Sequence, residues 1–315
     1  MKKEEFYFDS RDGETKIHAV KWIPDGEVRC ILQIVHGMAE YAARYERLAE
    51  KLTAQGILVT GEDHLGHGLS LYGEVPDPGH PLGYFCSHDP ATVVVRDVHR
   101  LKKTVQGQYP GVPYLIMGHS MGSFILRNYL CRYGTGIDGA IVMGTGMQPR
   151  VVVKFAKGLS KLLGMIQGQK HKSGLINAMA FGSYNKRIRH AESKMDWLST
   201  DREEVCKYLD DPLCGFTFTL NGFAALFELI DRLYDPEYLK KMPSDLPVLF
   251  LAGGEDPVGS YGSAPVKVAE SFRALGMKRV ECKIYPGMRH ELVNEKGRET
   301  VDADLLAWIK KTAAL

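Results

Sequence analysis

The chain has 315 residues, a length that allows about two ordinary domains or one large α/β fold. Hydrophobic residues make up 44% and charged residues 25% of the chain, which excludes a disordered chain, a collagen and a coiled coil. The 40 Lys and Arg residues against 38 Asp and Glu residues give a net charge of +2, so we expect no nucleic-acid partner.

No apolar run approaches the roughly 18 residues of a membrane span, and the first residues lack the apolar stretch of a signal peptide. The six cysteines are scattered and form no C-x-x-C pair. This usage favours free thiols in a reducing compartment over disulfides or a metal site, so we expect a cytoplasmic protein.

Short apolar runs alternate with helical patterns along most of the chain. Two antiparallel edge strands are expected at residues 5–8 and 16–22. Buried strands are expected at 31–35, 57–60, 114–117, 137–143, 248–251 and 280–285, and helices at 44–55, 92–105, 123–133, 266–275 and 300–311. The pattern predicts an α/β fold with an eight-stranded, mostly parallel sheet flanked by helices.

The alternation stops in the middle of the chain. Residues 147–235 show helical and irregular pieces without a clear strand, so we expect an insertion in a core formed by residues 1–146 and 236–315. The first helix of this insertion is amphipathic at 100° per residue. Its apolar arc carries Val151, Val152, Phe155, Leu159, Leu162, Leu163 and Ile166, and its opposite side carries Lys154, Lys157 and Lys161.

The pentapeptide Gly118-His119-Ser120-Met121-Gly122 joins an expected strand to an expected helix. A G-x-S-x-G sequence in this context indicates a nucleophile elbow, a strained turn that exposes the serine and admits only small residues two positions away on either side. Ser120 is therefore the candidate nucleophile.

A serine hydroxyl needs a base to take its proton, and in this architecture the order along the chain is nucleophile, acid, histidine. His171 and His190 follow Ser120 but lie in the insertion, whereas His290 follows the last strand, so we favour His290 as the base. The preceding strand ends in two candidate acids, of which Asp256 is favoured over Glu255 because Pro257 holds it in a glycine-rich turn.

The reaction also needs hydrogen-bond donors for the oxyanion that develops on the substrate. The backbone N–H of Met121, at the start of a helix, is one candidate. The N–H of Met38, in the loop after the strand that ends at Val35, is the other.

Five separated motifs resemble the monoacylglycerol lipase and lysophospholipase branch of the α/β-hydrolases, the serine aminopeptidase S33-like proteins. They are His36-Gly37-Met38-Ala39-Glu40 with Arg44-Tyr45, Asp63-His64-Leu65-Gly66-His67-Gly68-Leu69-Ser70, Gly118-His119-Ser120-Met121-Gly122, Asp256 and His290. The chain departs from the family pattern H-G-x-G-E-H-x-x-R-Y at Ala39 and Tyr41, where the family commonly has Gly and His.

The resemblance implies a serine hydrolase that cleaves carboxylic esters of acyl chains, monoacylglycerols or lysophospholipids, through an acyl-enzyme intermediate. It also implies that the insertion is a lid, that no metal or organic cofactor is needed, and that the segment from Asp63 to His67 is a structural turn. A carboxylesterase acting on small esters remains an alternative. So does a proline-iminopeptidase-like aminopeptidase, which would need lid carboxylates to hold an ammonium group. A binding protein that kept only the fold is disfavoured by the complete triad.

Two features of the insertion allow more than one interpretation. Phe155, Leu159 and Met165 suit an acyl chain, but the same arc could simply pack the lid onto the core. Residues 150–190 contain nine Lys or Arg and no Asp or Glu, which is compatible with a solvated face or with peripheral contact with an anionic membrane surface.

Overall fold

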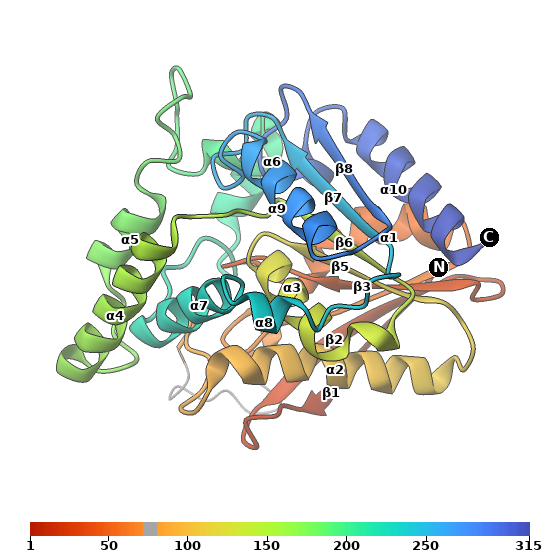
Figure 1. Ribbon diagram of the computed structural model, residues 1–315, viewed down its shortest axis with the longest axis horizontal. Helices are drawn as coiled ribbons and strands as arrows, with labels where there is room; N and C mark the ends of the chain where they lie inside the picture. The colour runs from red at the N-terminus through yellow and green to blue at the C-terminus, as the bar shows by residue number, and fades with distance from the viewer. Residues whose placement is uncertain (72–80) are drawn as a thin grey trace.

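Eight strands form one sheet in the computed structural model, which describes residues 1–71 and 81–315 (Figure 1). The strands are β1 (Lys2–Asp9), β2 (Lys16–Ile23), β3 (Cys30–Val35), β4 (Ile57–Glu62), β5 (Tyr114–His119), β6 (Gly139–Met143), β7 (Val248–Gly253) and β8 (Val280–Tyr285). Their order is β1-β2-β4-β3-β5-β6-β7-β8, with β2 antiparallel to both of its neighbours and the remaining pairs parallel. The predicted α/β fold and the eight-stranded sheet are confirmed.

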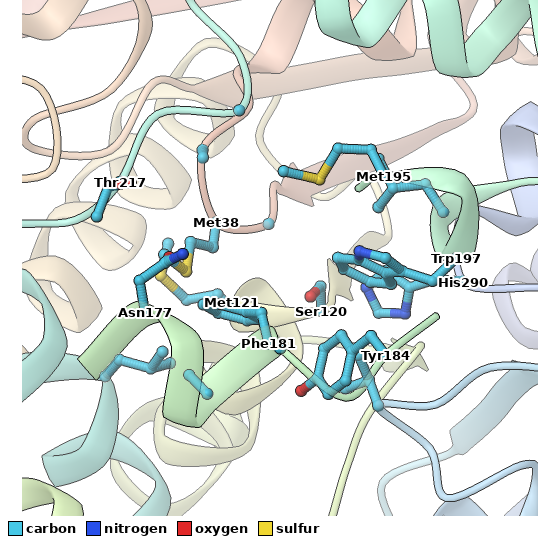
Figure 2. Close-up of a pocket in the computed structure, with 18 of the residues that line it drawn as sticks. Met38, Ser120, Met121, Asn177, Phe181, Tyr184, Met195, Trp197, Thr217 and His290 are labelled. Atoms are coloured by element: carbon cyan, nitrogen blue, oxygen red, sulfur yellow. The ribbon is translucent and has the colours of Figure 1, made fainter. Parts of the chain in front are cut away.

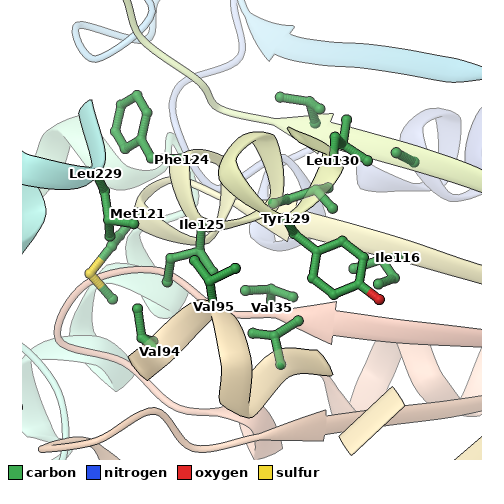
Figure 3. Close-up of a cluster of buried hydrophobic side chains, with 14 of the residues drawn as sticks. Val35, Val94, Val95, Ile116, Met121, Phe124, Ile125, Tyr129, Leu130 and Leu229 are labelled. Carbon is green, nitrogen blue, oxygen red and sulfur yellow. The ribbon is translucent and has the colours of Figure 1, made fainter. Parts of the chain in front are cut away.

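Helices cover both faces of the sheet. On one face, α1 (Glu46–Thr53) and α10 (Arg298–Ala313) bury their apolar sides against the strands. On the other face lie α2 (Pro90–Gln108), α3 (Met121–Tyr133) and α9 (Ser263–Ala274). Figure 3 shows part of this second layer, where Ile125 and Tyr129 of α3 pack against Val35, Val95 and neighbouring side chains. Because both faces of the central strands are covered, these strands are continuous apolar runs.

The strand order brings the loops after β3 and β5 together at the carboxyl ends of the central strands. From β3 the chain continues to β4 on one side, and β5 lies on the other side of β3. Ligands of open α/β sheets bind at such a switch point, outside the carboxyl ends of the strands. The loop after β3 and the turn after β5 therefore meet in the position expected for a site.

The chain between β6 and β7 is helical. It contains α4 (Arg150–Gln167), α5 (Gly174–Phe181), a short 3-10 turn (Asp196–Leu198), α6 (Arg202–Asp210), α7 (Leu220–Arg232) and α8 (Pro236–Leu239). In Figure 1, α4 and α5 lie at one end of the molecule, away from the sheet. Residues 147–235 form the helical insertion, whose boundaries stay a prediction. Within the described ranges, no helix is both long and apolar enough to cross a bilayer.

Helix α4 does not bury most of its apolar arc, although the arc suggests that this side packs against the core. Its small residues Val153, Ala156, Ser160 and Gly164 are buried and lie on the side that contacts α7. Most of the large residues of the arc face solvent, with Val151 81% and Phe155 61% exposed, although Leu159 and Leu163 are half-buried. Small side chains allow two helices to approach closely, and Lys157 forms ion pairs with Glu228 and Asp231 of α7. The interpretation that the whole arc packs onto the core is wrong.

Candidate active site

Ser120 occupies the turn between β5 and α3 with φ 52° and ψ −119°, a conformation that L residues rarely adopt. The turn is possible because of the glycines on either side. A Cβ atom on Gly122 would lie 1.9 Å from the carbonyl oxygen of Val35, and one on Gly118 would lie 2.3 Å from that of Gly122. The sequence context therefore produces the strained elbow that exposes the Ser120 hydroxyl.

The structure brings Asp256 and His290 together beside this elbow. The Nδ1 atom of His290 lies 2.9 Å from Oδ2 of Asp256, and Oδ1 of Asp256 accepts the backbone N–H of Val258 at 2.8 Å. Both side chains are buried. The Nε2 atom of His290 has no hydrogen-bond partner among the described residues, and Figure 2 shows the imidazole next to Ser120. With Nδ1–H donating to the carboxylate, Nε2 carries the lone pair that can take the serine proton.

The alternative acid and bases lie elsewhere. Glu255 points to solvent, although it directly precedes the buried Asp256. His171 and His190 are exposed in the helical insertion. The arrangement of Ser120 with Asp256 and His290 is therefore the one that can act as a catalytic triad.

The two predicted oxyanion donors line the same cavity as Ser120 (Figure 2). In the loop after β3, the N–H of Gly37 donates to Glu40 at 2.5 Å and the N–H of Ala39 donates to Nε2 of His67 at 3.2 Å. The N–H of Met38, between them, has no acceptor in the described part of the chain. The N–H of Met121 lies in the first turn of α3, where no intrahelical acceptor exists.

Three buried histidines hold the loop after β3. His36 accepts the N–H of His64 at Nε2 (3.0 Å) and donates from Nδ1 to the carbonyl of Gly37 (2.8 Å), while His64 donates to the carbonyl of His36 (3.2 Å). Burial lowers the pKa of all three rings, that of His67 to about 3, so they are neutral and their tautomers are fixed by these bonds. The turn from Asp63 to His67, which the resemblance identified as structural, supports the loop that carries Met38 through these bonds. Across residues 1–71 and 81–315, no three His, Cys, Asp or Glu side chains are grouped to hold a metal ion.

Sequence reasoning did not foresee a buried charge network behind the triad. Arg44 donates to Glu40 at 2.8 Å and, through both terminal nitrogens, to Glu291 at 2.8 Å. Burial alone would raise the pKa of Glu291, but Arg44 outweighs it and lowers the pKa below its ordinary value. Glu40 similarly overcomes the effect of burial on His119 and raises its pKa, and the other ring nitrogen of His119 faces the carbonyl of His290 at 3.2 Å. The network thus connects the loop after β3 to the backbone of His290.

A cavity of about 500 Å³ leads to Ser120 and is lined mainly by apolar side chains of α3, α4, α5 and α7. Its lining includes Phe124, Val153, Ile176, Phe181, Leu226 and Ile230. Trp197 covers His290, with 5.0 Å between the ring centroids. Such a cavity lies within the range of about 300–1,000 Å³ of small-molecule sites and suits an apolar ligand.

The structure does not place the predicted substrate contacts Phe155, Leu159 and Met165 among the cavity-lining residues. Phe155 and Met165 are 61% and 74% exposed, and Leu159, in the middle of α4, is half-buried against the core. The orientation of α4 instead directs Val152, Val153 and Ala156 towards the cavity. Hydrophobicity alone could not distinguish these faces, because the face that packs is the one with small residues.

Comparison with known proteins agrees with this geometry. Residues 26–297 match the family described as serine aminopeptidase, S33. The monoglyceride lipase of Rattus norvegicus is 36% identical over 298 residues, which cover 93% of this chain and 86% of the relative. The monoacylglycerol lipase of Mycolicibacterium smegmatis is 28% identical over 295 residues, with 91% and 90% coverage.

Among solved structures, a highly thermostable carboxyl esterase from Bacillus coagulans in complex with glycerol is 30% identical and superposes with a TM-score of 0.90. The superposition covers 99% of each chain. The chain belongs to the serine aminopeptidase S33 family and is an ester hydrolase with the α/β-hydrolase fold.

Proposed function

We propose that this ester hydrolase acts on single-chain acyl esters of glycerol, with monoacylglycerols as its main substrates and lysophospholipids as the nearest alternative. The observation that carries the proposal is the apolar cavity, which ends at Ser120 and His290. The similarity to the rat and mycobacterial lipases supports the same substrate class.

In the proposed mechanism, His290 takes the proton of Ser120 as the hydroxyl attacks the ester carbonyl. The N–H groups of Met38 and Met121 stabilise the resulting oxyanion, and Asp256 stabilises the imidazolium. His290 then protonates the leaving alcohol, which leaves the acyl chain on the serine. A water molecule, activated by the same histidine, releases the fatty acid in the second half of the reaction.

The charges that line the cavity favour an ester over a peptide substrate. An aminopeptidase needs a free carboxylate for the substrate ammonium group. Among the described residues, the carboxylates that line the cavity are Glu40 and Glu291, and Arg44 binds both of them. Neither is free to bind a cationic substrate.

Hydrolysis of a chain-length series of nitrophenyl esters, together with a monoacylglycerol, a lysophosphatidylcholine and an aminoacyl anilide, tests the proposal. Each buried CH₂ group contributes about 0.8 kcal/mol, so kcat/KM should rise about fourfold per CH₂ until the cavity is filled. Ser120→Ala should lower kcat by on the order of 10⁴ and abolish labelling by a fluorophosphonate. A preference for acetyl esters would instead indicate a small-ester carboxylesterase, and cleavage of the anilide would indicate an aminopeptidase.

We also propose that the exposed apolar face of α4 and α5 contacts a lipid surface. This face consists of Val151, Val152, Phe155, Leu162, Met165, Ile166, Leu175 and Met179, each at least 47% exposed. Val152 and Met179 also line the cavity, so the apolar surface continues into it. Lys157 pairs closely with α7 and Lys161 lies 4.0 Å from Glu228 of α7, but Lys154 and Lys161 are both exposed and can meet anionic headgroups.

Sedimentation with anionic phospholipid vesicles tests this contact. The double variant Phe155→Ser/Ile166→Ser should bind the vesicles more weakly than the unchanged protein, and both should hydrolyse a soluble short ester equally well. Leu209→Ser is the control, because Leu209 is likewise an exposed apolar residue (47%) but lies on α6. Equal sedimentation of the double variant and the unchanged protein would contradict the proposal. The cytoplasmic location stays a prediction.

A further inference from the structure

The oxyanion loop (residues 36–40) is held peptide by peptide. The peptide between His36 and Gly37 donates its N–H to Glu40 and accepts a hydrogen bond from His64 at its carbonyl. The next peptide accepts from the ring of His36 through the carbonyl of Gly37, and its N–H is that of Met38. Since the carbonyl and the N–H of a trans peptide point in opposite directions, holding the carbonyl aims the Met38 N–H.

The last anchors of this loop come from the helical insertion. The N–H of Ala39 donates to the ring of His67. The carbonyl of Ala39 accepts two hydrogen bonds. One comes from the hydroxyl of Tyr208 at 3.0 Å and the other from the backbone N–H of Gly215 at 3.0 Å. Tyr208 is itself held under the guanidinium of Arg44, 4.8 Å from the ring centroid.

Ala39 needs these anchors because of its backbone conformation. Its φ is 54°, in the left-handed region that side chains other than glycine rarely adopt. Ala39 is 4% exposed, and its carbonyl is held by the two protein donors Tyr208 and Gly215. Removing a partner would favour relaxation of φ to negative values, which rotates the neighbouring peptides and displaces the Met38 N–H.

We propose that Tyr208 is a positioning residue for the oxyanion hole: its hydroxyl, together with the Gly215 N–H, holds the Ala39 peptide and thereby keeps the Met38 N–H aimed at the developing oxyanion. The inference rests on the proposed role of Met38 in ester hydrolysis. It makes part of the insertion a support for catalysis in addition to a wall of the cavity.

Tyr208→Phe removes the hydroxyl but keeps the ring beside Arg44. Complete loss of an oxyanion donor costs about 10²–10³ in kcat, so a displaced donor should cost about tenfold. Because Tyr208 also lines the cavity, KM on a soluble short nitrophenyl ester is measured separately, and it should change by less than about twofold. Tyr238→Phe is the matched control, since its hydroxyl also donates to a buried backbone carbonyl, that of Asn128 in α3, away from the loop; it should leave both constants unchanged.

Inhibitors separate positioning from a general structural effect. A trifluoromethyl ketone adds to Ser120 and places an oxyanion in the hole, so its inhibition constant should rise in Tyr208→Phe by the same factor by which kcat falls. A matched alcohol, which forms no oxyanion, should bind both proteins equally. A variant with unchanged kcat, or with equal losses for both inhibitors, overturns the role of Tyr208. The proposed function is tested independently, because it rests on ester hydrolysis by the unchanged protein and its loss in Ser120→Ala.

Discussion

Replacing Arg44 with Met should destabilise the protein. It should also reverse the pH dependence that the buried network of Arg44, Glu40 and Glu291 contributes to the free energy of unfolding. Arg44 is the common partner of Glu40 and Glu291, and its side chain is only 10% exposed. In its absence Glu40 still accepts from Gly37 and from the hydroxyl of Tyr45, whereas Glu291 keeps a single bond from Asn294 at 3.0 Å. Glu291 is thus left as a buried charge without its ion-pair partner.

The expected magnitude follows from this imbalance. Removing one partner of a buried ion pair costs about 3–5 kcal/mol, so the free energy of unfolding should fall by about 4 kcal/mol at pH 8. In the unchanged protein both glutamates have pKa values below their ordinary range. Their contribution to stability is therefore present above about pH 4.5 and is lost as the pH falls through the lowered values.

In Arg44→Met, the pH dependence of stability that Glu291 contributes has the opposite sign. Burial without the guanidinium raises the pKa of Glu291 above its unfolded value, so the native state gains a proton and stability is lost as the pH rises. The variant should therefore be destabilised by about 4 kcal/mol at pH 8 and by less at pH 5, where Glu291 of the folded variant is still largely protonated.

Urea denaturation at pH 5 and pH 8, followed by tryptophan fluorescence, measures both values. Adding Glu291→Gln should recover part of the loss and remove most of the difference between the two pH values. Arg47→Met is a control, because Asp302 retains an ion pair with Lys51 at 2.7 Å and Arg47 is 28% exposed. An Arg44→Met protein that is destabilised equally at both pH values, or more at pH 5, would refute the reasoning.

Three further predictions follow from the site. Met38→Pro deletes an oxyanion donor and should lower kcat by roughly 10²-fold, whereas Met38→Ala keeps the N–H and should retain most of kcat; a collapse in folded Met38→Ala would show that the side chain matters. Asp256→Asn should lower kcat by roughly 10⁴-fold through the wrong tautomer of the histidine, and Glu255→Gln should have little effect, so steady-state kinetics in the reverse order would reassign the acid. Burial lowers the pKa of His67 to about 3, so below about pH 6.5 the native state binds fewer protons than the unfolded chain. The free energy of unfolding should therefore decrease by about 1.4 kcal/mol for each unit by which the pH is lowered from about 6.5 to 3. Urea titrations at pH 7 and pH 5 should show that His67→Gln lacks this contribution.

The fold was largely predictable because it depends on local patterns. The strands expected at 114–117 and 248–251 are continuous apolar runs of a sheet covered on both faces, and they appear as Tyr114–His119 and Val248–Gly253. The elbow at Ser120 was predictable because its motif fixes the backbone directly.

What escaped prediction depends on tertiary contacts. The partners Arg44 and Glu291 are 247 residues apart, and nothing in either local sequence indicates the pair. The contact between Tyr208 and Ala39 depends on how the insertion sits over the oxyanion loop. On α4, the periodicity located the apolar face correctly, but close packing of small residues such as Ser160 decided which side is buried.

The two hydrogen bonds at the Ala39 carbonyl also constrain how substrate can enter. A movement of α6, or of the turn that carries Gly215, would break these bonds and disturb the oxyanion loop. The opposite end of the insertion, formed by α4 and α5, has no such connection to Ala39 and carries the exposed apolar rim that includes Val152 and Met179. If the helical insertion opens as a lid, movement of α4 and α5 would leave the Ala39 hydrogen bonds intact, whereas movement of α6 would break one of them.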